Sequence, residues 1–446
     1  MDGITKRLAN FIVNTDYSQI PDEIYEHAKC AFMDYLAVAM EGADEPLVKK
    51  LVTFSRTMGG NEQATVLGRS NGKMSISQAA LINGGASHAL DYDDSLASFF
   101  GHPTVTLFPA IMALSEWNDK SGREFLVAYL VGLQVGAVIG TSAGKEHYMK
   151  GWHATSTIGH FASAAACANL LGLTVEQTVN ALGIAGTRSA GLKRMFGTMC
   201  KPYHAGMASE AGLIAALLAK DDFTSAADVL EGEYGFFHCC SGAADEAKLN
   251  KLGQEWDVVD LAQKYHASCH ATHSPIEVAT SLVDQHNIDL YRIESINIGV
   301  SKLALDAAGI SKPTSGLEGK FSIAFCVANA LVFKNTDQSA FTDERVVDPE
   351  IVILMDKINV YLDEDVGFLQ ADLSINLGDC EGSYQALFDV MEKIPSLLEK
   401  REKIGIKFHS ICSEITNEQH AEKLGKAILD INNTGSMKKF VSEIYD

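Results

Sequence analysis

The stretch from residue 86 to residue 109 concentrates side chains that could transfer protons. Asp91, Asp93 and Asp94 stand within four residues, and His102 follows eight residues after the last of them. Carboxylates this close repel one another, and burial raises their proton affinity further. A carboxylate and an imidazole on one short loop could therefore divide acid and base work near neutral pH. The alternative is structural, because Asp-rich turns often cap helices or are solvated.

A second stretch, residues 191–206, combines cations with a helix start. Lys201-Pro202 precedes a run of helical spacing, and Lys193 and Arg194 lie upstream. Proline at a first helical position leaves free N–H groups and a partial positive charge at that end. Lys201 beside this helix start would make a small anion site, and the alternative is a solvated lysine.

A third segment, residues 264–275, holds the side chains His266, Cys269, His270 and His273. Histidine spacings of four and three would place the imidazoles near one face of a helix, as in a zinc site. Ser268, Ser274 and Pro275 argue against a continuous helix, and no acidic fourth ligand lies nearby. Metal binding, surface or core packing, and anion recognition all stay open for these histidines.

Composition and charge limit the classes of partner. The 446 residues carry a formal net charge of −21, which opposes binding to nucleic acid or to anionic membranes. Nine cysteines, an odd number without regular spacing, indicate reduced thiols and a cytoplasmic protein. Residues 1–15 show no secretory or transit pattern, which favours the same location.

The most hydrophobic window is residues 126–140, shorter than the roughly 20 residues of a spanning helix, so we predict a buried helix. Gly132, Gly136 and Gly140 recur on one face of it, and they fit either a dimer interface or packing within the core. Residues 140–144 match G-x-S-x-G, but the preceding helix favours a helix-ending turn over a nucleophile elbow.

The periodicity of the chain changes near residue 264. Residues 1–260 read as mostly helical. Alternating apolar residues then predict three strands: 296–300, 358–362 and 373–377. Helical spacing is expected in residues 319–333, 349–357, 383–393 and 416–432. The chain is thus predicted to be mainly α, with strands confined to its later part.

This order of elements predicts two domains. A large all-helical domain is expected from both chain ends, residues 1–265 and 400–446. A smaller α/β domain, which we call the lid domain, is expected to be inserted between them at residues 266–399.

Five segments in this order resemble the MmgE/PrpD family: HALDYDDSLASFFGHP, YMKGWHATSTIGHFASAAA, GLKRMFGTMCKPYHAGMASEAGL, SCHATHSPIE and GKFSIAFCVANAL. The family includes 2-methylcitrate dehydratases, cis-aconitate decarboxylases and iminodisuccinate epimerases. The resemblance implies an all-helical domain with a smaller lid, a homodimer, and an active site in the cleft between the domains. It also implies small di- or tricarboxylate substrates, with neither a metal nor an organic cofactor.

The resemblance also implies roles for individual residues. The catalytic set it implies is Asp91, His102, Lys201 and Tyr148. The substrate-binding set is Ser95, His153, His273 and Phe325. Apart from the resemblance, Tyr148 could be a core aromatic and His153 a helix cap. By spacing, Phe325 occupies the place of a catalytic tyrosine in the decarboxylases, and the missing phenol disfavours decarboxylation.

These residues suggest one kind of chemistry. Breaking a C–H bond α to a carboxylate builds an aci-carboxylate, which fixed positive groups such as Lys201 stabilise. Asp91 or His102 would act as the base, and the other group as the acid. We expect a lyase of the 2-methylcitrate dehydratase type, with an epimerase acting on an iminodisuccinate-like dicarboxylate as the alternative. A cis-aconitate decarboxylase is the third expectation.

Overall fold

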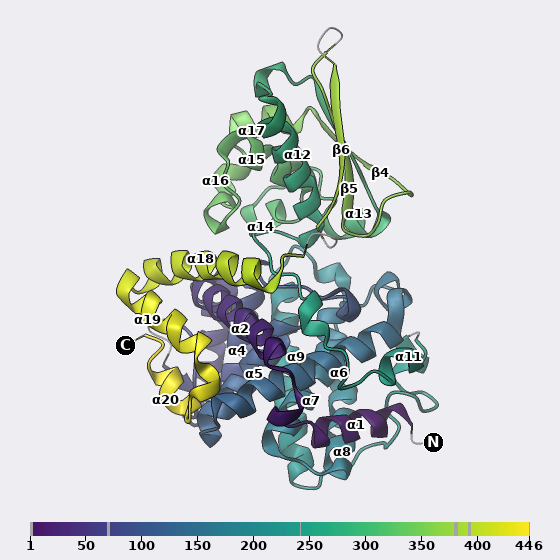
Figure 1. Cartoon of the computed structure of the whole chain (residues 1–446), viewed down its shortest axis with the longest axis vertical. Helices are drawn as coiled ribbons and strands as arrows, with labels where there is room; N and C mark the ends of the chain where they lie inside the picture. The colour runs from purple at the N-terminus through teal and green to yellow at the C-terminus, as the bar shows by residue number, and fades with distance from the viewer. Residues whose placement is uncertain (1–2, 69–71, 241, 379–381, 391–393, 446) are drawn as a thin grey trace.

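The computed structural model describes residues 3–68, 72–240, 242–378, 382–390 and 394–445. They form two bodies, each with its own core of buried apolar residues. The larger body is almost entirely helical, and the smaller one stands above it around a four-stranded sheet (Figure 1). The chain is therefore mainly α with a small sheet region, as predicted.

The larger body is built from both ends of the chain. Its N-terminal helices are α1 (Ile4–Asn14), α2 (Asp22–Gly42), α3 (Pro46–Met58), α4 (Ile76–Ala89), α5 (Thr104–Asn118), α6 (Gly122–Met149), α7 (Ala154–Leu171), α8 (Val175–Arg188), α9 (Cys200–Lys220), α10 (Phe236–Cys240) and α11 (Glu246–Leu249). A hairpin of β1 (Ala64–Thr65) and β2 (Lys73–Met74) lies between α3 and α4. The C-terminal helices are α18 (Leu397–Ile415), α19 (Glu418–Leu429) and α20 (Met437–Ser442), and α18 packs along α2 beneath the lid (Figure 1).

Helix α6 is the hydrophobic centre of this body. In the described part of the chain it alone is long and apolar enough to cross a membrane, but its apolar window is buried within the protein as in a core helix. A Cβ on Gly136 would meet the Phe99 ring at 2.2 Å, and one on Gly140 would meet the Ser98 carbonyl oxygen at 2.2 Å. These glycines therefore serve packing within the core rather than a dimer interface.

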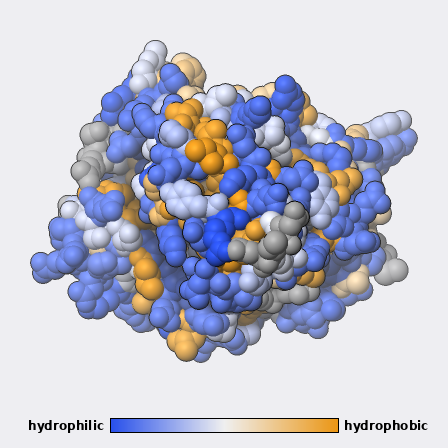
Figure 2. Space-filling view, turned by 90° about the horizontal axis from the view of Figure 1, so that it is seen from above, coloured by the Kyte–Doolittle hydropathy of each residue, from blue (hydrophilic) through white to orange (hydrophobic). Residues whose placement is uncertain are grey.

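The lid domain contains a mixed sheet in the order β4-β3-β5-β6. Its strands are β3 (Ser295–Val300), β4 (Ile358–Leu362), β5 (Gln370–Asn376) and β6 (Ser383–Asp389), and its helices are α12 (His273–His286), α13 (Lys302–Ala308), α14 (Gly316–Gly319), α15 (Ile323–Phe333), α16 (Asp343–Val346) and α17 (Pro349–Met355). β3 pairs parallel to β4 and antiparallel to β5. Figure 2, which looks down on this end of the molecule, shows a mostly hydrophilic face with separate hydrophobic groups.

The helix predicted for residues 383–393 is wrong. Residues 383–389 form the edge strand β6, which pairs with β5 from Ser383↔Asn376 to Asp389↔Gln370, and residues 391–393 lie outside the described residues. The segment contains Ala and Leu, which favour helices, but the neighbouring strand satisfies its backbone hydrogen bonds and overrides that preference. Residues 397–399, placed in the lid by the prediction, belong to α18.

A buried lysine of α18 joins the two ends of the chain. The Lys407 ammonium lies 2.7 Å from the Asp34 carboxylate on α2. It also donates to the carbonyl oxygens of Tyr92 at 2.7 Å and Lys264 at 3.0 Å. Burial lowers the pKa of Lys407, and the Asp34 carboxylate opposes that shift. The cation thus depends on three acceptors that tertiary folding brings together.

Replacing Lys407 by methionine should destabilise the protein by about 3 kcal/mol, because it leaves a buried carboxylate and two carbonyls without their donor. Urea unfolding followed by circular dichroism measures this. Lys426→Met is the matched control, since Lys426 and its partner Glu422 are largely exposed. Equal unfolding free energies for the two variants would contradict the importance of the buried pair.

The stability of the fold should also fall in mild acid. Burial lowers the pKa of His27 and of His160 to about 4 in the folded protein, while an unfolded histidine titrates near 6.5. The unfolded chain therefore binds more protons between pH 6.5 and pH 4, so the unfolding free energy decreases across that window. His160→Gln should weaken this dependence by about one proton, and His409→Gln, at an exposed residue, is the control.

Candidate active site

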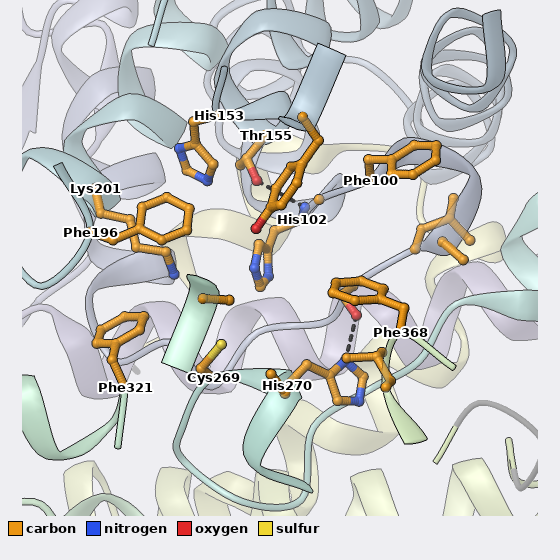
Figure 3. Close-up of a pocket in the computed structure, with 18 of the residues that line it drawn as sticks. Phe100, His102, His153, Thr155, Phe196, Lys201, Cys269, His270, Phe321 and Phe368 are labelled. Carbon is orange, nitrogen blue, oxygen red and sulfur yellow. Dashed lines mark hydrogen bonds between the residues drawn. The ribbon is translucent and has the colours of Figure 1, made fainter. Parts of the chain in front are cut away.

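A cavity of about 360 Å³ lies between the two domains (Figure 3). The helical domain contributes Ser95, Leu96, Ala97, Phe100, Gly101, His102, Tyr148, His153, Thr155, Phe196 and Lys201 to its wall. The lid side contributes Cys269, His270, Ala271, Ala307, Phe321, Phe368, Leu369 and Asp389. Five of the eight residues assigned to catalysis or substrate binding therefore line one cavity, namely Ser95, His102, Tyr148, His153 and Lys201. Cys269 and His270 of the third segment line it as well.

The acidic loop after α4 is held by three buried lysines. The ammonium groups of Lys320, Lys264 and Lys407 donate in that order to the carbonyl oxygens of residues 90, 91 and 92. Lys320 belongs to the lid, Lys264 to the segment leading into it, and Lys407 to α18. Asp91 adopts a left-handed backbone conformation with φ 52°. Parts of the chain remote in sequence thus fix the backbone from which the site's aspartates extend.

Asp91 accepts from two of the site's cations. Its Oδ1 lies 2.8 Å from the Lys201 ammonium and 3.0 Å from that of Lys264. Burial alone would raise the pKa of Asp91, but the two ammonium groups hold it well below its ordinary value. The carboxylate therefore stays ionised and is a weak base. It does not line the cavity, and its contacts fit the positioning of Lys201 better than proton abstraction.

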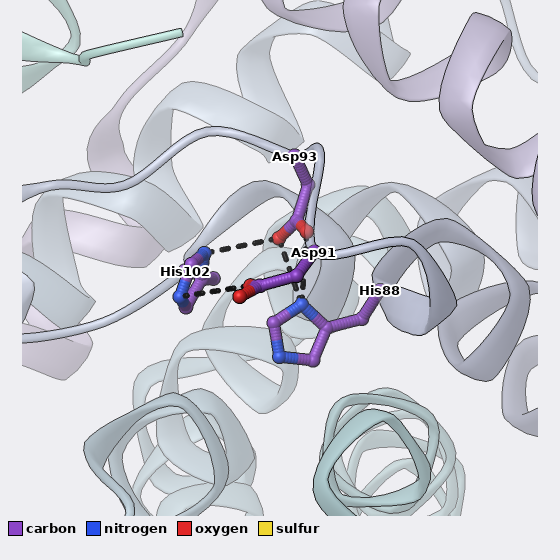
Figure 4. Close-up of side chains that lie close together, drawn as sticks. All are labelled: His88, Asp91, Asp93 and His102. Atoms are coloured by element: carbon purple, nitrogen blue, oxygen red, sulfur yellow. Dashed lines mark hydrogen bonds and ion pairs between the residues drawn. The ribbon is translucent and has the colours of Figure 1, made fainter. Parts of the chain in front are cut away.

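His102 is oriented by a second aspartate (Figure 4). Its Nδ1 lies 3.1 Å from Asp93 Oδ2 and 2.7 Å from the Asp94 carbonyl oxygen. Both neighbours accept hydrogen bonds, so Nδ1 carries a proton, and in the neutral tautomer of the ring the lone pair is on Nε2. Nε2 lies 3.9 Å from Asp91 Oδ1. His102 thus has the geometry of a general base on the cavity wall.

His88 contacts the same aspartate, Asp93. Its Nδ1 lies 2.9 and 3.0 Å from the two oxygens of Asp93. Burial lowers the pKa of His88 to about 4 despite that carboxylate, so the neutral ring donates its Nδ1 proton. Burial would raise the pKa of Asp93, but His88 and His102 hold it well below its ordinary value. Asp93 is therefore a carboxylate shared between two imidazoles.

Asp94 behaves differently from its two neighbours. Burial raises its pKa well above the ordinary value, and the nearby Asp34 carboxylate adds to the shift. Asp94 is 1% exposed and does not line the cavity. The raised proton affinity expected for crowded, buried carboxylates therefore applies to this aspartate only, because the other two face cations or imidazoles.

The spacing of four side chains could hold a metal ion. One ligand atom each from His88, Asp91, Asp93 and His102 lies within 4.8 Å of the others. A cation would compete there with the Lys201 and Lys264 ammonium groups, which already bind Asp91. The donor set therefore fits a network of hydrogen bonds and ion pairs better than a metal site.

Two neutral donors complete the helical side of the cavity. His153 Nδ1 lies 3.0 Å from His204 Nδ1, and burial next to Lys201 lowers the pKa of His153 well below its ordinary value. Burial raises the pKa of the Tyr148 phenol, which therefore keeps its proton. The Lys193 ammonium lies 3.7 Å above the Tyr148 ring. His153 and Tyr148 can therefore donate hydrogen bonds to a substrate without carrying charge.

The lid contributes different residues from those expected. His270 and Phe321 line the cavity, whereas His273 and Phe325 do not. His270 Nδ1 pairs with the Ser95 hydroxyl at 2.5 Å.

His273 and Phe325 lie away from the cavity because of where the helices α12 and α15 begin. His273 is the first residue of α12, and its ring packs on that of His270 with centroids 4.6 Å apart. Phe325 lies in the lid core beside Phe341. Ser322 caps α15, so position 321 precedes the helix and faces another way than position 325. Recognising Ser322 as the N-cap of α15 would have predicted from the sequence that positions 321 and 325 face different ways.

The chain matches the MmgE/PrpD N-terminal domain over residues 6–248 and the MmgE/PrpD C-terminal domain over residues 266–432. It therefore belongs to the MmgE/PrpD family and is an enzyme of that family. The predicted resemblance is confirmed.

Curated relatives extend over most of the chain. Cis-aconitate decarboxylase of Aspergillus terreus is 27% identical, with 96% of this chain and 93% of that protein aligned. The Mus musculus cis-aconitate decarboxylase is 26% identical, over 85% of this chain and 80% of that protein. 2-Methylcitrate dehydratase of Escherichia coli (strain K12) is 24% identical, over 80% and 77%. These names support a lyase and give no support to the epimerase alternative.

Replacing Asp93 by asparagine should lower kcat by roughly 10²–10⁴-fold with a smaller change in KM. The amide can donate to His102 Nδ1 and so favours the tautomer whose Nε2 carries the proton. Nitrogen-15 NMR of the imidazole would report that tautomer independently of turnover. Asp289→Asn, on the lid surface, is the control. An unchanged tautomer together with unchanged kcat would refute the positioning role of Asp93.

Proposed function

We propose that the protein is a lyase that dehydrates a small hydroxylated tricarboxylate of the 2-methylcitrate type. The observation that carries the proposal is the geometry of His102, whose Nδ1 faces Asp93 and the Asp94 carbonyl. This geometry favours a neutral base with its lone pair on Nε2, which suits abstraction of a proton α to a carboxylate.

The first step places charge where the site can stabilise it. His102 Nε2 takes the α-proton, and the electron pair of the broken C–H bond moves into the neighbouring carboxylate to form an aci-carboxylate. The Lys201 ammonium, positioned by Asp91 at 2.8 Å, stabilises that added charge. The aromatic rings of Phe196 and Phe321 lie 5.5 and 4.9 Å from the ammonium and keep water away from it.

The second step forms the double bond. The electron pair returns from the aci-carboxylate to make C=C, and the C–O bond to the β-hydroxyl breaks. Tyr148, which keeps its proton, is our candidate for the acid that converts the departing hydroxide into water. In this scheme the side chains of the chain supply base, cation and acid, and we propose no cofactor.

A second candidate reaction is decarboxylation of a cis-aconitate-like substrate. The relatives named cis-aconitate decarboxylase, at 27% and 26% identity, favour it over the dehydratase at 24%. Loss of CO₂ would leave its electron pair on an aci-carboxylate beside Lys201, and the imidazolium form of His102 would protonate the carbon. Among the described residues, the aromatic side chains on the lid wall are Phe321 and Phe368, so this wall offers no phenol.

The two reactions differ in their products. In D₂O, dehydration of 2-methylcitrate should raise the absorbance of an enoate and release no CO₂. Decarboxylation of cis-aconitate should release one CO₂ and place one deuterium on carbon. Lys201→Ala and His102→Gln should each lower the rate of the true reaction by roughly 10²–10⁴-fold. The exposed variant His409→Gln is the control.

Turnover that survives both substitutions at the control rate would rule out this site for either reaction. A homodimer and a cytoplasmic location, expected from the resemblance and the composition, stay predictions, which light scattering and cell fractionation would test.

A further inference from the structure

The cavity has two chemically different ends. Lys201 and His153 lie at one end with Phe196 and Phe321, and Phe100 and Phe368 lie at the other end with the neutral ring of His270, with His102 between them (Figure 3). Among the described residues of the wall, Lys201 is the one lysine or arginine. The anionic groups of a carboxylate substrate therefore have their charged partner at the Lys201 end. The other end suits a part of the substrate that carries no charge.

On the side of the helical domain, a turn at residues 96–101 forms the wall of the apolar end. The Leu96 amide donates to the Gly101 carbonyl oxygen at 2.9 Å, which closes the segment on itself. Phe99 is fully buried beside Gly136, whereas Phe100, with φ 54°, faces the cavity. The turn thus directs consecutive phenylalanines to opposite sides, one into the core and one into the cavity.

The lid side of the apolar end is also held in place. The backbone carbonyl of Phe368 accepts from the Ser301 hydroxyl at 3.0 Å, and that of Leu369 accepts from Ser274. Asp389 pairs in register with Gln370 and so lies next to these residues on the wall. This end of the wall therefore offers an acidic residue and no lysine or arginine, while Phe368 and Leu369 offer apolar surface to a neutral hydrocarbon.

The volume also exceeds the needs of a small acid. Pockets of about 300–1,000 Å³ usually hold drug-sized ligands, and this cavity of about 360 Å³ falls in that range. A cavity in that range has room for a ligand larger than a six-carbon acid.

We infer that the substrate carries a hydrophobic substituent larger than a methyl group, an alkyl chain of several carbons, which lies between Phe100 and Phe368. The inference rests on the proposed function, because that function places the carboxylates at Lys201. It names the substrate as an alkyl-substituted polycarboxylate rather than methylcitrate or aconitate itself.

The gain in binding affinity depends on the number of methylene groups that the apolar end buries. Burying one methylene strengthens binding by roughly fourfold. A chain extended by four methylenes inside the apolar end should therefore bind on the order of a hundredfold more tightly.

Binding and turnover test the inference separately. Calorimetry with succinate, methylsuccinate, butylsuccinate and hexylsuccinate measures binding without requiring any reaction. We expect affinity to rise by roughly fourfold per carbon through butylsuccinate. A flat or falling series would overturn the inference, even if 2-methylcitrate or cis-aconitate is turned over. A rising series with no turnover of any alkylcitrate or alkylaconitate would support the apolar site and reject the proposed reaction.

Variants locate the site of the effect. Phe368 is 40% exposed, so Phe368→Glu should fold, and it should abolish the gain with chain length, measured as the ratio of butylsuccinate affinity to succinate affinity. Leu362→Glu adds the same charge to the lid at a residue that is 44% exposed and does not line the cavity. This control should keep the full gain. An equal gain in Phe368→Glu and the control would place the alkyl chain elsewhere and overturn the inference.

Discussion

The structure of the site depends on three buried ammonium groups that bind three consecutive carbonyl oxygens. Lys320, Lys264 and Lys407 reach residues 90–92 from the lid, from the segment entering the lid, and from the C-terminal helix. Desolvating a cation is costly unless acceptors replace its water. Here the acceptors are carbonyls and carboxylates, so the cations are stable only when the two domains and both chain ends are assembled. The cavity is consequently built by the same contacts that join the domains.

These cations also decide what the aspartates can do. Asp91 faces Lys201 and Lys264 and stays ionised, Asp93 faces two imidazoles and stays ionised, and Asp94 faces no such group, so burial raises its pKa well above the ordinary value. Three identical side chains within four residues thus have three environments. A protein with a net charge of −21 gathers four lysines at this loop, and one of them, Lys201, lines the cavity where a carboxylate substrate would meet it. This local concentration of positive charge suits an anionic substrate, although the protein as a whole is acidic.

Local patterns predicted most of the elements but not all of their partners. The alternation at residues 296–300 and 358–362 identified β3 and β4, because one face of each strand contacts the lid core or its helices. Residues 383–389 formed a strand against expectation, since pairing with β5 outweighed helical preference. The glycines of α6 showed a close approach, but only the structure showed that Phe99 is what approaches.

The sequence by itself determined the chemistry available: a cluster of aspartates, a His102 on the same loop, a Lys201 at a helix start, and the family to which this order of motifs belongs. Tertiary structure alone decided which group plays which part. Lys264 bonds Asp91 across 173 residues, and nothing in either local segment indicates that contact. Proton affinity and orientation depend on charges and burial within a few ångströms in space, and distance along the chain does not report them. Our proposal of His102 rather than Asp91 as the base therefore required the folded molecule.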